Sequence, residues 1–336
     1  MNAVTAFFRV GPSQNDHLPA LRVALGVAVP LVVLLLLNRI DLAVFAVFGA
    51  FTGVFGRGDP HGIRLQHQSA AAILLLAAIA AGILVTEYDA GPWAVVVGSA
   101  FVGGLGSVAA DRWALRPAGP FFPVFAFAGT ALISSSATAP EAFGTAAVSA
   151  MLSLAIGAAG WLLPSGRSAW PGRRTRAQLP AVQLRANAAR YAVAAGVAGG
   201  IATLLGIGHN YWAIVSAIVP LAAATRATRL QRAVHRVLGT IVGLGLTGLL
   251  LVVGLVPWQL VLVLIALQFL TEMFVVRHYS LALVFITPLA LLMSELAAPV
   301  ADEGSLLADR FLETLIGVAV GVLVVLLIRD PRSTSD

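Results

Sequence analysis

Twelve apolar runs follow one another along the chain, and they constrain its fold more than any other feature. The core of a bilayer is about 30 Å thick, which an α-helix crosses in about 20 residues. The alternating pattern of membrane β-strands is absent. We therefore predict an all-α integral membrane protein with about twelve transmembrane helices. The expected spans are 20–37, 42–56, 68–86, 93–109, 121–136, 142–163, 188–205, 211–225, 233–255, 258–275, 280–298 and 308–328.

Composition supports a membrane protein. Of the 336 residues, 59% are hydrophobic and 11% are charged, whereas soluble domains carry roughly 25% charged residues. All 21 basic residues are arginine. They lie mostly in short loops between the apolar runs, where they indicate membrane orientation and give no reason to expect a nucleic-acid partner.

The loop charges predict which side of the membrane each loop faces. Acidic residues gather on one side, at Asp41, Glu87, Asp89 and Glu141, with Arg39 as an exception. The opposite loops are rich in arginine, which marks the cytoplasmic side. Both termini are therefore expected in the cytoplasm. The inner arginines are Arg57, Arg64, Arg112, Arg116, Arg167, Arg173, Arg174, Arg176, Arg185, Arg226, Arg229, Arg232 and Arg277.

The two halves of the chain align with each other at nearly constant offsets. Six spans in each half would run parallel, related by an axis along the membrane normal. We expect a first repeat at 1–163, a basic cytoplasmic linker at 164–187 and a second repeat at 188–336. The matched residues are Arg22 with Arg190, His67 with His235, Pro92 and Trp93 with Pro257 and Trp258, Arg112 with Arg277, and Pro123 with Pro288.

The second span of each half is short, which indicates a candidate transport site. Residues 42–60 are glycine-rich, and residues 211–229 carry Pro220 in the middle. Interrupted spans at matching places in two repeats are typical of substrate sites in transporters. The alternative is close helix packing through small residues.

Carboxylates inside the spans are candidates for proton coupling. Glu272 lies near the inner end of its span, and Glu313 lies one turn into the last span beside Asp309 and Arg310. A carboxylate within the membrane is costly unless it is paired or protonated. The alternative is a structural ion pair with an arginine such as Arg22, Arg190 or Arg236.

Basic residues at the span ends have two interpretations. Arg22 and Arg190 open matching spans, and either extend to the lipid headgroups or attract an organic anion. His235 and Arg236 enter the third span of the second half, and Arg236 is a further candidate for the substrate path. Tyr211 and Trp212 are expected in the aromatic belt at the membrane surface.

Four segments resemble the FUSC family, the fusaric acid resistance-like proteins of the aromatic acid exporter superfamily. They read "NYWAIVSAIVPL", "RLQRAVHRVLGTIVGLGLTG", "EMFVVRHYSLALVFITPLALLM" and "DRFLETLIGVAVGV", and the resemblance covers about 190–328. Many relatives carry a sizeable soluble domain, where this chain has a short linker. The matching residues are Tyr211, Trp212, Arg236, Gly239, Thr240, Glu272, Arg310, Glu313 and Thr314.

The resemblance implies an exporter of aromatic or other hydrophobic organic acids in a bacterial inner membrane, driven by protons. The expected partners are the lipid bilayer, a small organic anion and protons, with a second copy of the chain or a periplasmic adaptor as further candidates. Two alternatives stay open: an organic-anion channel or permease, and a membrane scaffold without transport. An enzyme, a cofactor and a metal are not expected, because the chain has no cysteine, no lysine for a Walker A motif and no HExxH motif.

Overall fold

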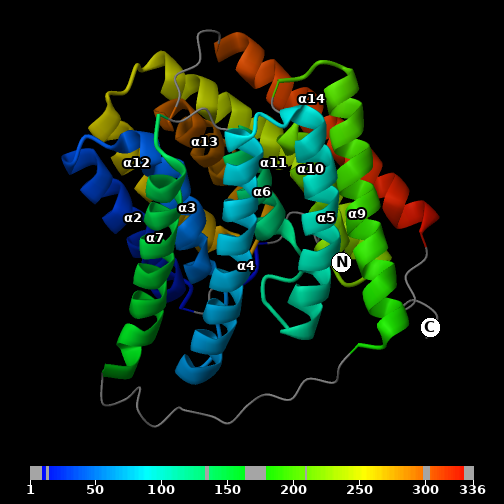
Figure 1. The fold of residues 1–336 in the computed structure, drawn as a ribbon, viewed down its shortest axis with the longest axis horizontal. Coiled ribbons are helices and arrows are strands. Elements are labelled where there is room, and N and C mark those ends of the chain that lie inside the picture. Colours follow the sequence, from blue (N-terminus) through cyan, green and yellow to red (C-terminus); the bar gives the residue numbers. More distant parts are fainter. Residues whose placement is uncertain are drawn as a thin grey trace.

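The computed structural model describes residues 10–12, 15–132, 136–162, 179–208, 210–297 and 303–328, which form an all-helical bundle (Figure 1). No strand occurs among these residues, so the prediction of an all-α protein is confirmed. The first half contains α2 (His17–Leu36), α3 (Ala43–Ala50), α4 (His61–Glu87), α5 (Gly91–Arg112), α6 (Phe121–Leu132) and α7 (Ala139–Ala159). The second half contains α9 (Ala181–Leu204), α10 (Tyr211–Ile218), α11 (Arg226–Val252), α12 (Pro257–Phe274), α13 (Tyr279–Ala297) and α14 (Glu303–Leu327).

Each of the twelve expected spans overlaps one of these α-helices. Eight of the helices are long and apolar enough to cross a membrane, namely α2, α4, α5, α7, α11, α12, α13 and α14. Helix α9 is long enough but less apolar, because Arg185, Asn187 and Arg190 occupy its first half. Helices α3, α6 and α10 are short. The chain is therefore a multi-pass α-helical membrane protein.

The two short second helices end for different local reasons. Helix α10 stops at Ile218, and Pro220 opens a 3-10 turn, η4 (Pro220–Ala222), since proline has no N–H to continue the α-helix. Helix α3 lies between two 3-10 turns, η1 (Ile40–Leu42) and η2 (Phe51–Val54). Gly56 then reverses the chain with φ +67°. Both interruptions fall where the sequence predicted them.

The last helix of each half packs tightly on the short second helix of the same half: α7 packs on α3, and α14 packs on α10. A Cβ atom on Gly49 of α3 would lie 2.1 Å from the carbonyl oxygen of Ala146 on α7. A Cβ atom on Gly317 of α14 would lie 2.2 Å from the carbonyl oxygen of Ala213 on α10. Only glycine permits these backbone approaches, which is the usual way that helices pack inside a membrane.

The remaining contacts join the helices within and between the halves. Helix α4 packs on α6 and α7, and α11 packs on α13 and α14. Between the halves, α2 packs on α12 and α5 packs on α9. Figure 1 shows the α2–α12 pair at the left edge of the bundle and the α5–α9 pair at the right.

Arg39, the exception in the loop charges, is compensated by its neighbours. Its guanidinium lies 3.2 Å from the Asp41 carboxylate and 2.8 Å from the Glu141 carboxylate. Both acidic residues belong to the same side of the bundle, so the net charge of that side stays negative. The ion pairs therefore explain how an arginine is retained there.

The expected linker at 164–187 differs from the structure at its end. Helix α9 begins at Ala181, so residues 181–187 are already helical and extend the first helix of the second half. Residues 164–178 lie outside the described residues.

Candidate functional site

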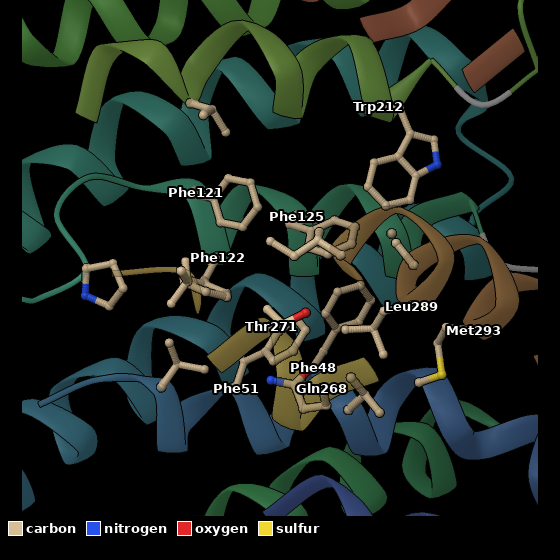
Figure 2. Close-up of a pocket in the computed structure, with 18 of the residues that line it drawn as sticks. Phe48, Phe51, Phe121, Phe122, Phe125, Trp212, Gln268, Thr271, Leu289 and Met293 are labelled. Atoms are coloured by element: carbon tan, nitrogen blue, oxygen red, sulfur yellow. The ribbon is translucent and has the colours of Figure 1, made fainter. Parts of the chain in front are cut away.

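A cavity of about 210 Å³ lies between the two short helices, α3 and α10. Helix α6 forms a third wall, and α11, α12 and α13 close the remaining sides. Its lining is dominated by aromatic rings, several of which point toward one another across the cavity in Figure 2. The aromatic lining consists of Phe48, Phe51, Phe121, Phe122, Phe125, Tyr211, Trp212 and Tyr279.

The rings contact one another at distances typical of aromatic pairs. Phe125 lies at the centre of the group, with its ring centroid 5.0 Å from those of both Phe48 and Trp212. Phe51 and Phe122 are 5.2 Å apart in an edge-on arrangement. Edge-on and tilted pairs at these distances are favourable. The group therefore presents ring faces and edges to the cavity, which suits a flat aromatic ligand.

Arg236 is the most unusual charge on the cavity wall. Its side chain is 1% exposed. One Nη donates to the Tyr279 hydroxyl at 3.3 Å and the other to the Ser216 hydroxyl at 3.2 Å, while Nε has no partner among the described residues. No described carboxylate lies within 4.0 Å of the guanidinium. A buried cation held by neutral hydroxyls is costly, so the site favours an anion beside it.

Glu272 also lines the cavity, but its charge is paired. The Arg57 guanidinium lies 2.9 Å from the Glu272 carboxylate and also donates to the Glu272 carbonyl oxygen at 2.6 Å. Arg57 comes from the loop after η2 in the first half, and it lies 3.2 Å from the Asp16 carboxylate. The sequence suggested Arg22, Arg190 or Arg236 as partners. The structure corrects this: the partner is Arg57, and Arg22 instead donates to the Arg57 carbonyl oxygen at 2.9 Å.

Arg310 and Glu313 lie directly behind the aromatic wall. The Arg310 guanidinium carbon is 3.9 Å from the centroid of the Trp212 ring, a cation–π contact, and Arg310 itself does not line the cavity. Glu313 is fully buried one turn along α14, and neither of its carboxylate oxygens accepts a hydrogen bond from a described residue. A carboxylate buried within a membrane without hydrogen-bond donors is costly, which marks Glu313 as a candidate functional residue.

The other predicted site residues lie outside the aromatic cavity. Pro220 is buried in the turn that ends α10, between the lining residues Val219 and Ala222. His235 is buried with its ring centroid 5.0 Å from that of His278. Asp309 is partly buried on α14, and Arg190 lines a second cavity. The structure thus places Arg236 and Glu272 at the aromatic cavity and Arg310 and Glu313 behind it.

One sequence expectation was wrong and several residues were missed. Tyr211 and Trp212 are 5% and 3% exposed and line the cavity, so they are not belt residues at the lipid surface. Arg57 was assigned to orientation alone. The phenylalanines at spacings of three and four residues along α3 and α6 were the available signal for an aromatic wall.

Among the described residues, no group of three or more histidine, aspartate or glutamate side chains could hold a metal ion. The aromatic cavity is lined by aromatic and aliphatic side chains, by two arginines, Arg232 and Arg236, and by one carboxylate, that of Glu272.

Comparison with known proteins gives a family for the second half. Residues 197–324 match the family described as "Fusaric acid resistance protein-like". A stretch of 148 residues is 30% identical to "Uncharacterized membrane protein YvaC" of Bacillus subtilis (strain 168). It covers 44% of this chain and 24% of that relative, so the chain aligns with about a quarter of the relative's length. No solved structure matches the chain. The resemblance to the FUSC family is therefore confirmed over residues 197–324.

Proposed function

We propose that this protein is a secondary transporter that exports small aromatic organic acids across the inner membrane of a bacterium. The observation that carries the proposal is Arg236, a buried cation without a carboxylate partner among the described residues, on the wall of an aromatic cavity. The family description, fusaric acid resistance-like, agrees with export of an organic acid. In this account the aromatic rings bind the ring of the substrate and Arg236 binds its carboxylate.

The size of the cavity supports a substrate with one ring. An engineered cavity of about 150 Å³ in another protein holds benzene. A volume of about 210 Å³ leaves room for one ring with a carboxylate or another small substituent. Drug-sized ligands occupy larger pockets, of roughly 300–1,000 Å³. Benzoate is therefore the first substrate to test.

The proposed architecture is two parallel six-helix repeats that meet at the cavity. The support is that equivalent helices of the two halves make equivalent contacts. Helix α4 packs on α6 and α7, as α11 packs on α13 and α14. Across the halves, α5 packs on α9, as the equivalent helix α12 packs on α2. The short helix packs on the last helix in both halves. A transport site between the interrupted helices of two repeats follows a pattern known in other transporters.

We place the arginine-rich loops and both termini in the cytoplasm, following the positive-inside rule. The chain contains no cysteine, so a single introduced cysteine reports its own position. Ala90→Cys lies on the acidic side and Ala227→Cys on the arginine-rich side, both at exposed positions. Labelling of position 90 alone by a membrane-impermeant maleimide in intact spheroplasts supports this orientation. Labelling of position 227 alone rules it out.

Coupling to protons is assigned to Glu313. It is buried without hydrogen-bond donors among the described residues, and Arg310, one turn before it on α14, contacts Trp212 on the cavity wall. Protonation of Glu313 would change the charge around Arg310, and thereby the contact between Arg310 and Trp212. Glu272 is a second candidate, but its ion pair with Arg57 favours a structural role.

The export proposal is tested with purified protein in liposomes loaded with a pH gradient. Benzoate that accumulates against its own gradient, and only with protein and a proton gradient present, supports a coupled transporter. Flux that follows the benzoate gradient alone indicates a channel. Absence of flux for every aromatic acid in a panel overturns transport and favours a scaffold.

A further inference from the structure

A second cavity lies beside the aromatic one, at the arginine-rich end of the bundle. Its volume is about 410 Å³, and it is enclosed by α5, α9, the start of α11, and the loops at 115–119 and 221–224. The two cavities share the lining residues Pro117, Ala118, Ala222 and Arg232. The second cavity therefore adjoins the first at a common wall, on the side that we place in the cytoplasm.

The charges that line this second cavity are strongly unbalanced. It is lined by four arginines, Arg116, Arg190, Arg229 and Arg232, and by a single carboxylate, that of Asp111. The Asp111 carboxylate accepts a hydrogen bond of 2.8 Å from the Asn187 amide. The excess of positive charge at one concave site raises the local concentration of anions.

Two of these arginines are held in the wall by the fold. The side chains of Arg190 and Arg229 are 2% and 4% exposed. Arg229 Nε donates to the Ala223 carbonyl oxygen at 2.8 Å, which fixes the guanidinium against the loop that ends η4. The charges are therefore preorganised, so a ligand would not have to order them.

Arg232 connects the second cavity to the first. It lines both, and its guanidinium carbon lies 5.2 Å from the centroid of the Tyr279 ring. Tyr279 in turn accepts a hydrogen bond from Arg236. A row of positive groups thus runs from Arg190 and Arg229, through Arg232, to the buried Arg236.

We propose that the second cavity is an anion-binding vestibule that receives the carboxylate of an organic acid from the cytoplasm before it enters the aromatic cavity. The site recognises negatively charged oxygen atoms through its arginines. The entry of the substrate from the cytoplasm rests on the proposed export function. Anion binding at Arg190 and Arg229 does not depend on that function. Both parts are therefore testable separately.

The test is equilibrium dialysis of radiolabelled benzoate against the purified chain in phosphatidylcholine nanodiscs. All samples carry Arg236→Gln, so that binding in the aromatic cavity contributes little. Arg190→Gln and Arg229→Gln are each expected to weaken the remaining binding roughly tenfold, the loss of about one charge-assisted hydrogen bond. The matched controls are Arg185→Gln and Arg226→Gln, exposed positions on the same two helices, which should leave binding unchanged.

Ala224→Trp provides a variant that keeps every arginine. Ala224 lines the cavity and is exposed, so the larger side chain should block the site without removing charge. Thermal unfolding of each variant identifies those that have lost the fold. Reduced binding in Ala224→Trp and in at least one folded arginine variant supports the vestibule. Equal binding in folded Ala224→Trp, Arg190→Gln and control samples overturns it.

A third arm separates a free anion from a lipid headgroup, which offers similar phosphate oxygens. Nanodiscs with phosphatidylglycerol should leave benzoate binding within about twofold. If phosphatidylglycerol abolishes benzoate binding, a lipid headgroup is the occupant and the vestibule is overturned. If dialysis succeeds and benzoate is not transported by wild-type liposomes, the anion site stands and the export proposal fails.

Discussion

Replacing Arg236 by glutamine should weaken substrate binding in the aromatic cavity while leaving the fold at least as stable. Arg236 is 1% exposed, and among the described residues its guanidinium donates hydrogen bonds to the Tyr279 and Ser216 hydroxyls, at 3.3 and 3.2 Å. A buried charge without a charged partner costs several kcal/mol. Glutamine removes that cost and retains an amide that can donate to one hydroxyl. Stability and function should therefore respond in opposite directions.

The size of the functional effect follows from the expected contact with a carboxylate. A hydrogen bond to a charged group contributes about 1.5–3 kcal/mol, which corresponds to roughly 10- to 150-fold in a dissociation constant. Arg236→Lys keeps the charge but not the two-pronged geometry, so it should fall between wild type and Arg236→Gln. The matched control is Arg226→Gln, an exposed position on the same helix.

The assay is benzoate uptake by proteoliposomes at several substrate concentrations, with thermal unfolding measured on the same preparations. The expected result for Arg236→Gln is a rise in apparent KM of at least tenfold with an unfolding temperature equal to or above that of wild type. Unchanged uptake by a folded Arg236→Gln variant would refute the role of this arginine. A large drop in stability would show instead that its charge is structurally required.

Three further substitutions test other parts of the account. Gly317→Val should destabilise the protein by at least about 1–3 kcal/mol, because its side chain would overlap the α10 backbone; Gly245→Val, where nothing lies within 4 Å, should change the unfolding temperature much less. Phe125→Ala should raise the uptake of naphthoate relative to benzoate by enlarging the cavity. If the ratio of naphthoate to benzoate uptake is the same in Phe125→Ala as in the control Phe101→Ala, an exposed position, Phe125 does not line the substrate site. Glu313→Gln should abolish accumulation driven by a pH gradient but retain exchange of labelled for unlabelled benzoate, and accumulation at the wild-type level excludes Glu313 as the coupling residue.

The apolar runs predicted the position of every α-helix among the described residues, because a membrane helix must be apolar over most of its length. They did not predict how long the short helices are. Residues 42–56 and 211–225 are apolar throughout because they are buried in the bundle, and burial does not require a continuous α-helix. Pro220 marked one interruption directly, while η2 after α3 left only a glycine-rich signal.

The sequence predicted those residues of the candidate site whose type is rare within an apolar span. Arg236 and Glu272 stood out because charges within apolar spans are uncommon. Phe48 and Phe125 did not, since phenylalanine is as common against lipid as against a cavity. Arg57 lies in a loop, where the positive-inside rule alone already accounts for an arginine. Its pairing with Glu272 depends on the packing of the two halves, which no local pattern contains.

The central claim is tested most directly by benzoate uptake into inside-out vesicles with and without an acidic lumen. Vesicles without the protein measure passive permeation and are subtracted. The account predicts accumulation above equilibrium that requires the acidic lumen, falls at least tenfold in Arg236→Gln at low benzoate concentration, and persists in Arg226→Gln. Uptake that ignores the pH gradient, or that is equal in the two arginine variants, would contradict it.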